Sequence, residues 1–405
     1  MKKLLPLLLL LSLSAGAQQD SSEKKAGEAP KPAQKKWYEN VSLRGYVQIR
    51  YNRLFETNPK LKCEQCDRSW GENGGIFLRR VRLIFFGQPH ERIYFYIQPD
   101  LASAPTATGA QHFAQIRDAY VDVGLDRKNE YRLRLGQSKI PFGFENMQSS
   151  QNRLPLDRND ALNSALSNER DLAAIFYWAP EATRKLFSSL VNEGYKGSGD
   201  YGVFGFGVYN GQTANRPEQN NNLHAVARLS YPFAIGNQII EPSVQGYTGK
   251  YVVTPDQQSN GTKVKADRNY TDRRVAGTFV LYPKPFGIQA EYNRGKGPEF
   301  NTLTDSIETR NLSGGYATFS YMFKANKQLI YPFFRFQKFS GGKKHELDAR
   351  SYDVEEYEIG VEWQPFRNFE FVAQYTISER RFEDFRNKSN VQKGNLLRLQ
   401  AQLNF

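Results

Sequence analysis

Cysteine is scarce in this sequence. The 405 residues contain two, Cys63 and Cys66, both in one short polar stretch. A structural zinc site needs a second ligand pair, and the chain has none, so no metal site and no cofactor are expected. Two cysteines three positions apart in an oxidising compartment are better explained as a candidate disulfide within a small loop, with no part in function.

Long hydrophobic runs are equally scarce. The one clear run, residues 4–13, follows Lys2 and Lys3 and precedes small residues that end at Ala17. This pattern predicts a secretory signal peptide cleaved near Ala17, and the lack of a cysteine directly after it argues against a lipoprotein. No later stretch is apolar over 18 residues, which predicts no membrane-spanning helix in the mature chain. A mature chain that crosses a membrane would therefore have to be a closed β-barrel.

The composition fits such a barrel. Only 39% of the residues are hydrophobic and the mean hydropathy is −0.65, as expected if half of each strand faces a water-filled lumen. Residues 18–36 are rich in Ser, Glu, Lys, Ala and Pro and show no apolar period. We therefore predict a signal peptide over 1–17, a disordered periplasmic tail over 18–40 and an outer-membrane barrel over 41–405. The net charge of +13 points to anionic partners.

Strict alternation of apolar and polar residues marks both ends of the predicted barrel. In the last twelve residues, Leu399, Leu403 and Phe405 share one face while Arg398 and Gln402 share the other. Residues 41–51 alternate in the same way. A full-length apolar face opposite a polar one is typical of a strand between lipid and water, although an amphipathic edge strand of a soluble sheet has the same pattern.

Sixteen antiparallel strands account for the chain. They are predicted at 41–51, 76–87, 91–101, 112–125, 130–138, 172–180, 200–210, 223–232, 238–248, 271–282, 286–294, 311–323, 327–338, 354–364, 368–380 and 394–405. Short turns alternate with long loops, such as 139–171, 249–270 and 295–310, as in an even-stranded barrel with its turns in the periplasm. The spacer 181–199 fits least well, and 185–191 could hold one more strand. Sixteen strands leave an aqueous channel.

The side-chain phase of residues 76–87 follows from the cost of burying arginine in lipid. Placing Arg80 and Arg82 outward would cost roughly 2–4 kcal/mol each, so both are expected to face the lumen, with Arg79 near the rim or in a bulge. Other predicted pore and anion-binding residues have the same phase or lie at the ends of the longest loop, 139–171, which we expect to fold inward and narrow the pore. They are Arg44, Arg50, Arg132, Arg134, Lys139 and Arg170. Rings of Arg and Lys favour anions, and guanidinium groups suit phosphate oxygens.

Carboxylates are expected in the same lumen. Asp100 and Asp118 are the candidates for the constriction, and Glu356, Glu358 and Glu362 are also phased inward. A carboxylate among arginines weakens anion binding enough for an ion to leave, or it serves only as an ion-pair partner.

Five segments, in order, are similar to the phosphate-selective porin O and P family. They are FLRRVRL at 77–83, DAYV at 118–121, LGQSKIPFG at 135–143, NERD at 168–171 and VYNG at 208–211. This resemblance covers about 41–405 and implies a sixteen-stranded homotrimeric porin with an arginine ladder. It places the family's paired pore arginines at Arg79 and Arg80 and its constriction lysine at Lys139. The sequence departs from the pattern at Ala173, in the long spacer 181–199 and in the cysteine loop.

The predicted function is passive passage of small anions, phosphate among them, through the outer membrane of a Gram-negative bacterium. Expected partners are small anions, membrane lipid and lipopolysaccharide, and the barrel-assembly machinery through the strand ending at Phe405, with no nucleic acid. A porin without a phosphate site, an adhesin and a soluble all-β binding protein are the alternatives. An enzyme is disfavoured because no Ser or Asp companion is recognisable for any of the histidines, His90, His112, His224 and His345.

Overall fold

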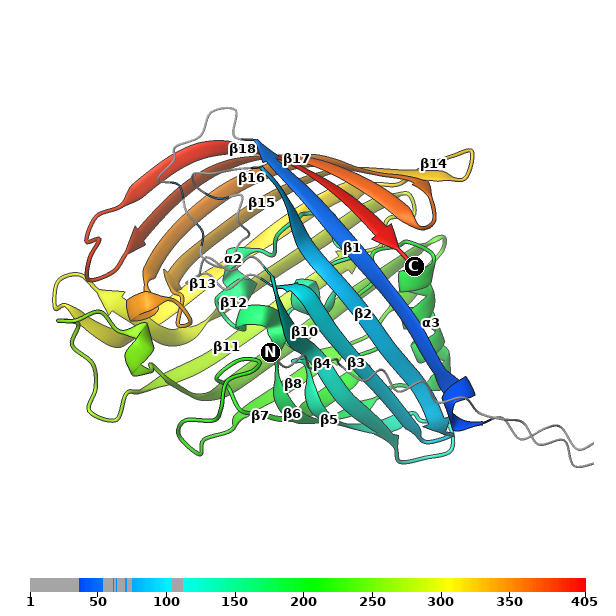
Figure 1. The fold of residues 1–405 in the computed structure, drawn as a ribbon, viewed down its shortest axis with the longest axis horizontal. Helices are drawn as coiled ribbons and strands as arrows, with labels where there is room; N and C mark the ends of the chain where they lie inside the picture. The colour runs from blue at the N-terminus through cyan, green and yellow to red at the C-terminus, as the bar shows by residue number, and fades with distance from the viewer. Residues whose placement is uncertain (1–35, 54–60, 62, 64–69, 71–74, 104–111) are drawn as a thin grey trace, which may run out of the picture. The chain divides into compact units, whose positions relative to one another are not determined.

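A single sheet that closes on itself contains most of the described residues (Figure 1). The structure, a computed structural model, describes residues 36–53, 61, 63, 70, 75–103 and 112–405. The predicted signal peptide and most of the predicted tail lie outside these residues. The last four tail residues form the short helix η1 (Trp37–Asn40), so regular structure begins slightly earlier than predicted. Gly87 allows this close approach, because a Cβ there would lie 2.1 Å from the Asn40 carbonyl oxygen.

Eighteen strand segments form the sheet, and all the ladders between them are antiparallel. In chain order they are β1 (Val41–Arg53), β2 (Ile76–His90), β3 (Ile93–Ser103), β4 (Phe113–Gly124), β5 (Tyr131–Lys139), β6 (Arg170–Trp178), β7 (Phe204–Tyr209), β8 (His224–Ser230), β9 (Phe233–Ile235), β10 (Gln238–Val252), β11 (Asn269–Leu281), β12 (Phe286–Asn301), β13 (Ser306–Tyr321), β14 (Phe323–Ala325), β15 (Gln328–Gly342), β16 (Ser351–Phe366), β17 (Phe369–Glu383) and β18 (Val391–Asn404).

Two of these segments, β9 and β14, continue the strand before them, so the barrel has sixteen strands. β8 and β9 both pair with β10, and β13 and β14 both pair with β15. The last strand closes the barrel on the first, with Tyr46 opposite Asn404 and Arg53 opposite Leu397. The closed sixteen-stranded antiparallel barrel is therefore confirmed.

The barrel is apolar outside and polar inside. Leu43 is 60% exposed on the outer face while Arg50 is fully buried, and Val275 is 62% exposed beside Arg274 at 2%. Because successive side chains of a strand point to opposite faces, one alternating pattern supplies both surfaces. The phase predicted for β2 is also confirmed: Arg80 and Arg82 are buried in the interior, and the ladder with β1 skips Arg79, which is the bulged residue.

Strands extend further than predicted at the end of the barrel that carries the long loops. β12 and β13 continue until only residues 302–305 connect them, so the predicted loop 295–310 is wrong. The reason is that paired strands outside the hydrocarbon layer need no apolar face, and the alternation used to detect them disappears there. Long connections remain at 140–169 and 253–268.

The spacer 181–199 contains a helix, α3 (Glu181–Asn192), where an extra strand was the alternative. Its buried residues Thr183, Phe187 and Leu190 are spaced by four and three, which is a helical period. Gly194, with φ of +81°, follows the helix at a position that favours glycine. No helix in the described part of the chain is long and apolar enough to cross a membrane.

Cys63 is disulfide-bonded, and it is buried in a small cluster with Leu61, Trp70 and Leu396. Its predicted partner, Cys66, lies outside the described residues. The cluster lies against β18 through Leu396, and its Trp70 indole donates to the Asp157 carboxylate at 3.4 Å.

Candidate functional site

A long segment between β5 and β6, residues 140–169, folds into the barrel. It contains the short helices α1 (Phe144–Met147), α2 (Asp160–Asn163) and η2 (Ser167–Glu169). Gly143, with φ of +84°, turns the chain into α1. Nearly all of the segment is buried, and Figure 1 shows α2 within the ring of strands. We call it the inserted loop.

Ion pairs hold the inserted loop against one side of the lumen, the inner faces of β11–β18, which we call the far wall. Arg335 donates to the Glu145 carboxylate at 2.8 Å and to the Asp157 carbonyl oxygen at 2.9 Å. Asp160 accepts from Arg380 at 2.8 Å and also pairs with Lys343. Arg398 pairs with the Asp157 carboxylate.

Backbone groups of the inserted loop are satisfied by the same wall. The amides of Phe144, Leu156 and Asp160 donate to Glu291, Gln374 and Gln337, all at 2.8–2.9 Å. Apolar side chains of the inserted loop pack in three clusters. Two join the loop to far-wall residues, and the third joins it mainly to β6, β7, β8 and β10. A loop with this many satisfied groups is a fixed part of the lumen.

An open cavity of about 420 Å³ remains between the inserted loop and the opposite side of the barrel, the inner faces of β3–β6. We call these faces the near wall. Other lining residues come from β1, the inserted loop and α3. The charged and aromatic ones are Arg44, Arg92, Tyr94, Tyr96, Asp118, Tyr120, Asp122, Arg132, Arg134, Lys139, Arg170, Arg184, Asp200 and Tyr201.

Cations outnumber carboxylates in this cavity by seven to three. Arg134 is fixed by a bidentate bond to Asp122, at 2.7 and 2.8 Å, and Arg170 donates to Asp118 at 2.9 Å. Arg44, by contrast, is exposed in the lumen, 5.1 Å from the ring of Phe86. The carboxylates thus neutralise part of the charge and leave the cavity basic.

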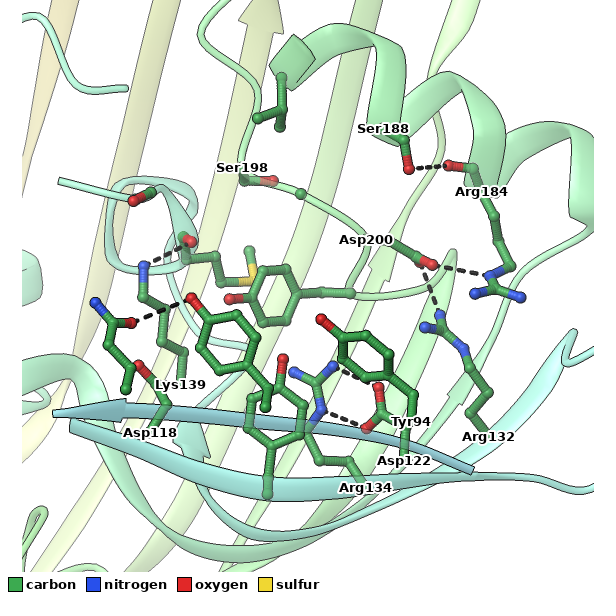
Figure 2. Close-up of a pocket in the computed structure, with 18 of the residues that line it drawn as sticks. Tyr94, Asp118, Asp122, Arg132, Arg134, Lys139, Arg184, Ser188, Ser198 and Asp200 are labelled. Carbon is green, nitrogen blue, oxygen red and sulfur yellow. Dashed lines mark hydrogen bonds and ion pairs between the residues drawn. The ribbon is translucent and has the colours of Figure 1, made fainter. Parts of the chain in front are cut away.

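Asp200 joins two arginines at the end of the cavity where the short turns lie. Figure 2 shows Arg132 and Arg184 reaching it from different elements, at 2.8 and 2.9 Å. Burial by itself would raise the pKa of the Asp200 carboxyl, but the two guanidinium groups outweigh it and the pKa is lowered. The carboxylate is therefore charged at neutral pH.

Lys139 has a positioning role in the structure. Its Nζ donates to the carbonyl oxygens of Met147 and Gln148 at 2.9 and 2.8 Å. It lines the cavity while fastening the chain of the inserted loop just after α1.

The remaining predicted residues lie outside the cavity. Arg50 binds Gln400 and pairs with Asp157, Arg80 donates to Gln48, and Arg82 donates to Asp100 and Tyr46. They are buried behind the inserted loop, whose Ser150 contacts Tyr46 and Arg82. Arg79 is bulged and partly buried among charges that include Asp157 and Asp100. The structure therefore separates the predicted arginines into a group that lines the cavity and a group packed behind the inserted loop, and all of them except Arg44 and Arg79 are at most 5% exposed.

Sequence reasoning missed Arg92, Arg184 and Asp200, as well as the tyrosines of the near wall. Arg184 and Asp200 lie in the 181–199 region or next to it, where the helix was not recognised. The tyrosines had a usable signal, since Tyr94 and Tyr96 have the same phase as the lumen-facing residues of β3.

The segment that contains α3 spans the short-turn end of the barrel. From β6 it reaches the far wall, where Lys196 pairs with Glu362 and the Tyr331 hydroxyl donates to the Gly194 carbonyl oxygen at 2.9 Å. Gln148 of the inserted loop donates to the Lys196 carbonyl oxygen at 2.6 Å. The two insertions are thus joined, and both border the cavity.

One histidine has a carboxylate partner, and that pair is buried. Against expectation, His224 has an Asp companion, Asp272, at 3.3 Å. Both side chains are fully buried, however, and Asp272 also binds Lys344 and the Tyr247 hydroxyl. Within the described ranges, no cluster of three His, Cys, Asp or Glu residues could hold a metal ion.

Comparison with known proteins agrees with the barrel fold. A family model described as phosphate-selective porin O and P matches residues 62–405. Among solved structures, OmpF of Salmonella typhi in complex with daunomycin has a TM-score of 0.56 at 12% identity, covering 90% of this chain and 97% of that one. The channel DcaP of Acinetobacter baumannii has a TM-score of 0.50 at 15% identity, with coverage of 90% and 97%. The trimer form of OmpT of Vibrio cholerae has a TM-score of 0.50 at 11% identity, with coverage of 90% and 99%. No curated protein sequence matches.

Proposed function

Because the chain belongs to the phosphate-selective porin O and P family and is an outer-membrane channel of a Gram-negative bacterium, we propose that it is a passive, anion-preferring porin. It admits phosphate and related small anions through a basic constriction, with no covalent step. A channel with the same anion preference but no phosphate site is the second candidate.

The observation that carries this proposal is the excess of cations in the cavity, seven against three carboxylates. Anions enter a pore more readily when the lining charges are positive, and low-dielectric walls concentrate that field. The family's paired arginines and constriction lysine correspond to Arg79, Arg80 and Lys139. We assign direct solute contact to Arg44, Arg132, Arg134 and Arg170, and a supporting electrostatic role to Arg50, Arg79, Arg80 and Arg82.

The carboxylates next to these arginines fit a channel better than a binding protein. Asp118 accepts from Arg170 and Asp122 accepts from Arg134. A passing anion must compete with a resident carboxylate, which keeps binding weak enough for release.

Reversal potentials in planar bilayers test the main claim. Under a KCl gradient, the purified protein is expected to show a reversal potential of the sign set by chloride. Cation preference in that measurement would reject the proposal.

Phosphate addition tests the finer claim. Phosphate on one side is expected to reduce the chloride current at micromolar to millimolar concentration, because guanidinium groups bind phosphate oxygens in pairs. A chloride current that phosphate leaves unchanged would support the second candidate instead.

The surroundings of the channel belong to the same proposal. The short turns and both ends of the mature chain would lie in the periplasm, after removal of residues 1–17. The strand ending at Phe405 would be read by the barrel-assembly machinery, and lipid and lipopolysaccharide would cover the apolar outer face. A homotrimer is supported by the similarity to the trimer form of OmpT, and gel filtration with crosslinking in detergent would test it.

A further inference from the structure

The cavity is larger than an inorganic anion requires. Its volume of about 420 Å³ lies within the range of sites that hold organic ligands, roughly 300–1,000 Å³. The cations and carboxylates described above account for recognition of charge only. The tyrosines of the same wall have no role in that description.

Three of these tyrosines lie on the near wall and the fourth lies next to it. Tyr94 and Tyr96 are two apart on β3, Tyr120 is directly opposite Tyr96 on β4, and Tyr201 lies just before β7. The rings of Tyr96 and Tyr120 are stacked, with centroids 5.3 Å apart and planes inclined by 15°. All four side chains are only partly buried and line the cavity. We call them the tyrosine strip.

Cations border the tyrosine strip closely. The Arg134 guanidinium lies 3.9 Å from the ring centroid of Tyr120 and 5.7 Å from that of Tyr201, and Figure 2 shows it beside Asp122, which holds it there, close to Tyr94. Arg44, Arg92 and Arg132 line the same cavity. A solute in this space therefore meets an aromatic surface and positive charge at once.

We propose that the cavity favours organic anions in which a carboxylate or phosphate is attached to a flat ring. The ring would lie on the tyrosine strip and the anionic group would face the bordering arginines. Inorganic phosphate would use only the second contact. This inference rests on the proposed anion channel and specifies its solute class.

Two matched pairs of anions test this proposal with the full-length protein in a planar bilayer. Benzoate is compared with acetate, and phenyl phosphate with methyl phosphate, so that charge is equal within each pair. We expect the ring-bearing anion to halve the chloride current at a concentration roughly 5- to 10-fold lower, the factor that aromatic stacking and apolar contact provide. Equal concentrations within both pairs would overturn the proposal.

Variants separate the ring from the hydroxyl. Tyr96→Leu is expected to remove most of the difference within each pair, whereas Tyr96→Phe keeps the ring and should retain it. Tyr357→Leu, on the outer face of β16, serves as the control and should behave as the parent. If Tyr96→Phe loses the difference as fully as Tyr96→Leu, the hydroxyl is the recognition element and the ring proposal is wrong.

Failure of the anion channel itself has a different signature. It would appear as cation preference under a KCl gradient, before any organic anion is added. Anion preference together with equal block by ring-bearing and ring-free anions would instead reject the tyrosine strip alone.

Discussion

The near and far walls of the lumen both carry arginines, but the arginines of the two walls have different partners. On the far wall, Arg335, Arg380 and Arg398 each bind a carboxylate or carbonyl oxygen of the inserted loop. On the near wall, the cations outnumber the carboxylates and border open space. The inserted loop directs three of its four carboxylates, Glu145, Asp157 and Asp160, to the far wall, whereas Glu169 pairs with Arg170 on the near wall. The loop thereby leaves the excess of positive charge on the near wall.

Far-wall charges are therefore expected to affect stability and near-wall charges to affect selectivity. Breaking a buried ion pair leaves an uncompensated charge in a low-dielectric site. Changing a charge that faces water in a pore alters the field that an ion meets, with little cost to the fold.

The largest expected effect is on the far wall. Asp160→Ala leaves Lys343 and Arg380 without a buried acceptor that they share, which should lower the free energy of unfolding by about 3–5 kcal/mol. Single-channel conductance should also rise and become noisy as the inserted loop loosens. Unfolding in detergent micelles and bilayer recording measure the two effects.

A matched control for Asp160 lies on the outside of the barrel. Glu355→Ala removes the partner of Lys338 in an exposed pair, and exposed pairs contribute little. Equal losses of stability in the two variants would mean that the far wall does not hold the loop.

Next in size is a change of selectivity in the cavity, at Arg44 of β1. Arg44→Glu changes the charge at an exposed position of the cavity by two units. Since one unit charge at contact distance in water corresponds to a factor of roughly five, the chloride-to-potassium permeability ratio should fall by at least about fivefold. Stability should stay as in the parent. Lys250→Glu, exposed on β10, is the control, and an equal shift in that variant would show that the general surface field decides selectivity.

A smaller change of the opposite sign is expected at Asp200. Asp200→Asn keeps the side-chain shape but removes the charge shared by Arg132 and Arg184, so the permeability ratio should rise by about two- to threefold. Asp267→Asn, in the exposed loop 253–268, should leave the ratio unaltered. A fall of the ratio on substitution of Asp200 would contradict the assignment.

The smallest effect is that of mild acid. The two arginines lower the pKa of Asp200. The carboxylate therefore stays charged and paired with both arginines down to the ordinary pKa of aspartate, and the ion pairs are lost only as the pH falls through the lowered pKa of Asp200. Selectivity set by these ion pairs should therefore stay constant from pH 7 to about pH 4, the ordinary pKa of aspartate. If reversal potentials showed selectivity changing with a midpoint near pH 6, a group other than Asp200 would control it.

Much of the barrel could be read from the sequence because a lipid-facing strand must keep one face apolar. This constraint was enough to predict all sixteen strands and the inward direction of Arg80 and Arg82. The alternating pattern is lost where that constraint is absent. The two cases are the extended hairpin of β12 and β13, and α3, which forms part of a connection at the short-turn end and does not face lipid.

The candidate site could be predicted only in part, because phase says that a side chain points inward but not what it meets there. Arg44, Arg132 and Arg134 meet open space, whereas Arg50 and Arg82 have the same inward phase and meet the inserted loop. The sequence also gave no sign that Asp200 would lie between arginines from β5 and α3.

Sequence alone determined that this chain forms a closed barrel and carries inward-facing arginines, since both follow from local patterns that water and lipid impose residue by residue. The tertiary structure decided which of those arginines remain available to a solute. That outcome depends on contacts between segments more than a hundred residues apart, such as Asp160 with Arg380 and Glu145 with Arg335. No local pattern encodes such pairings.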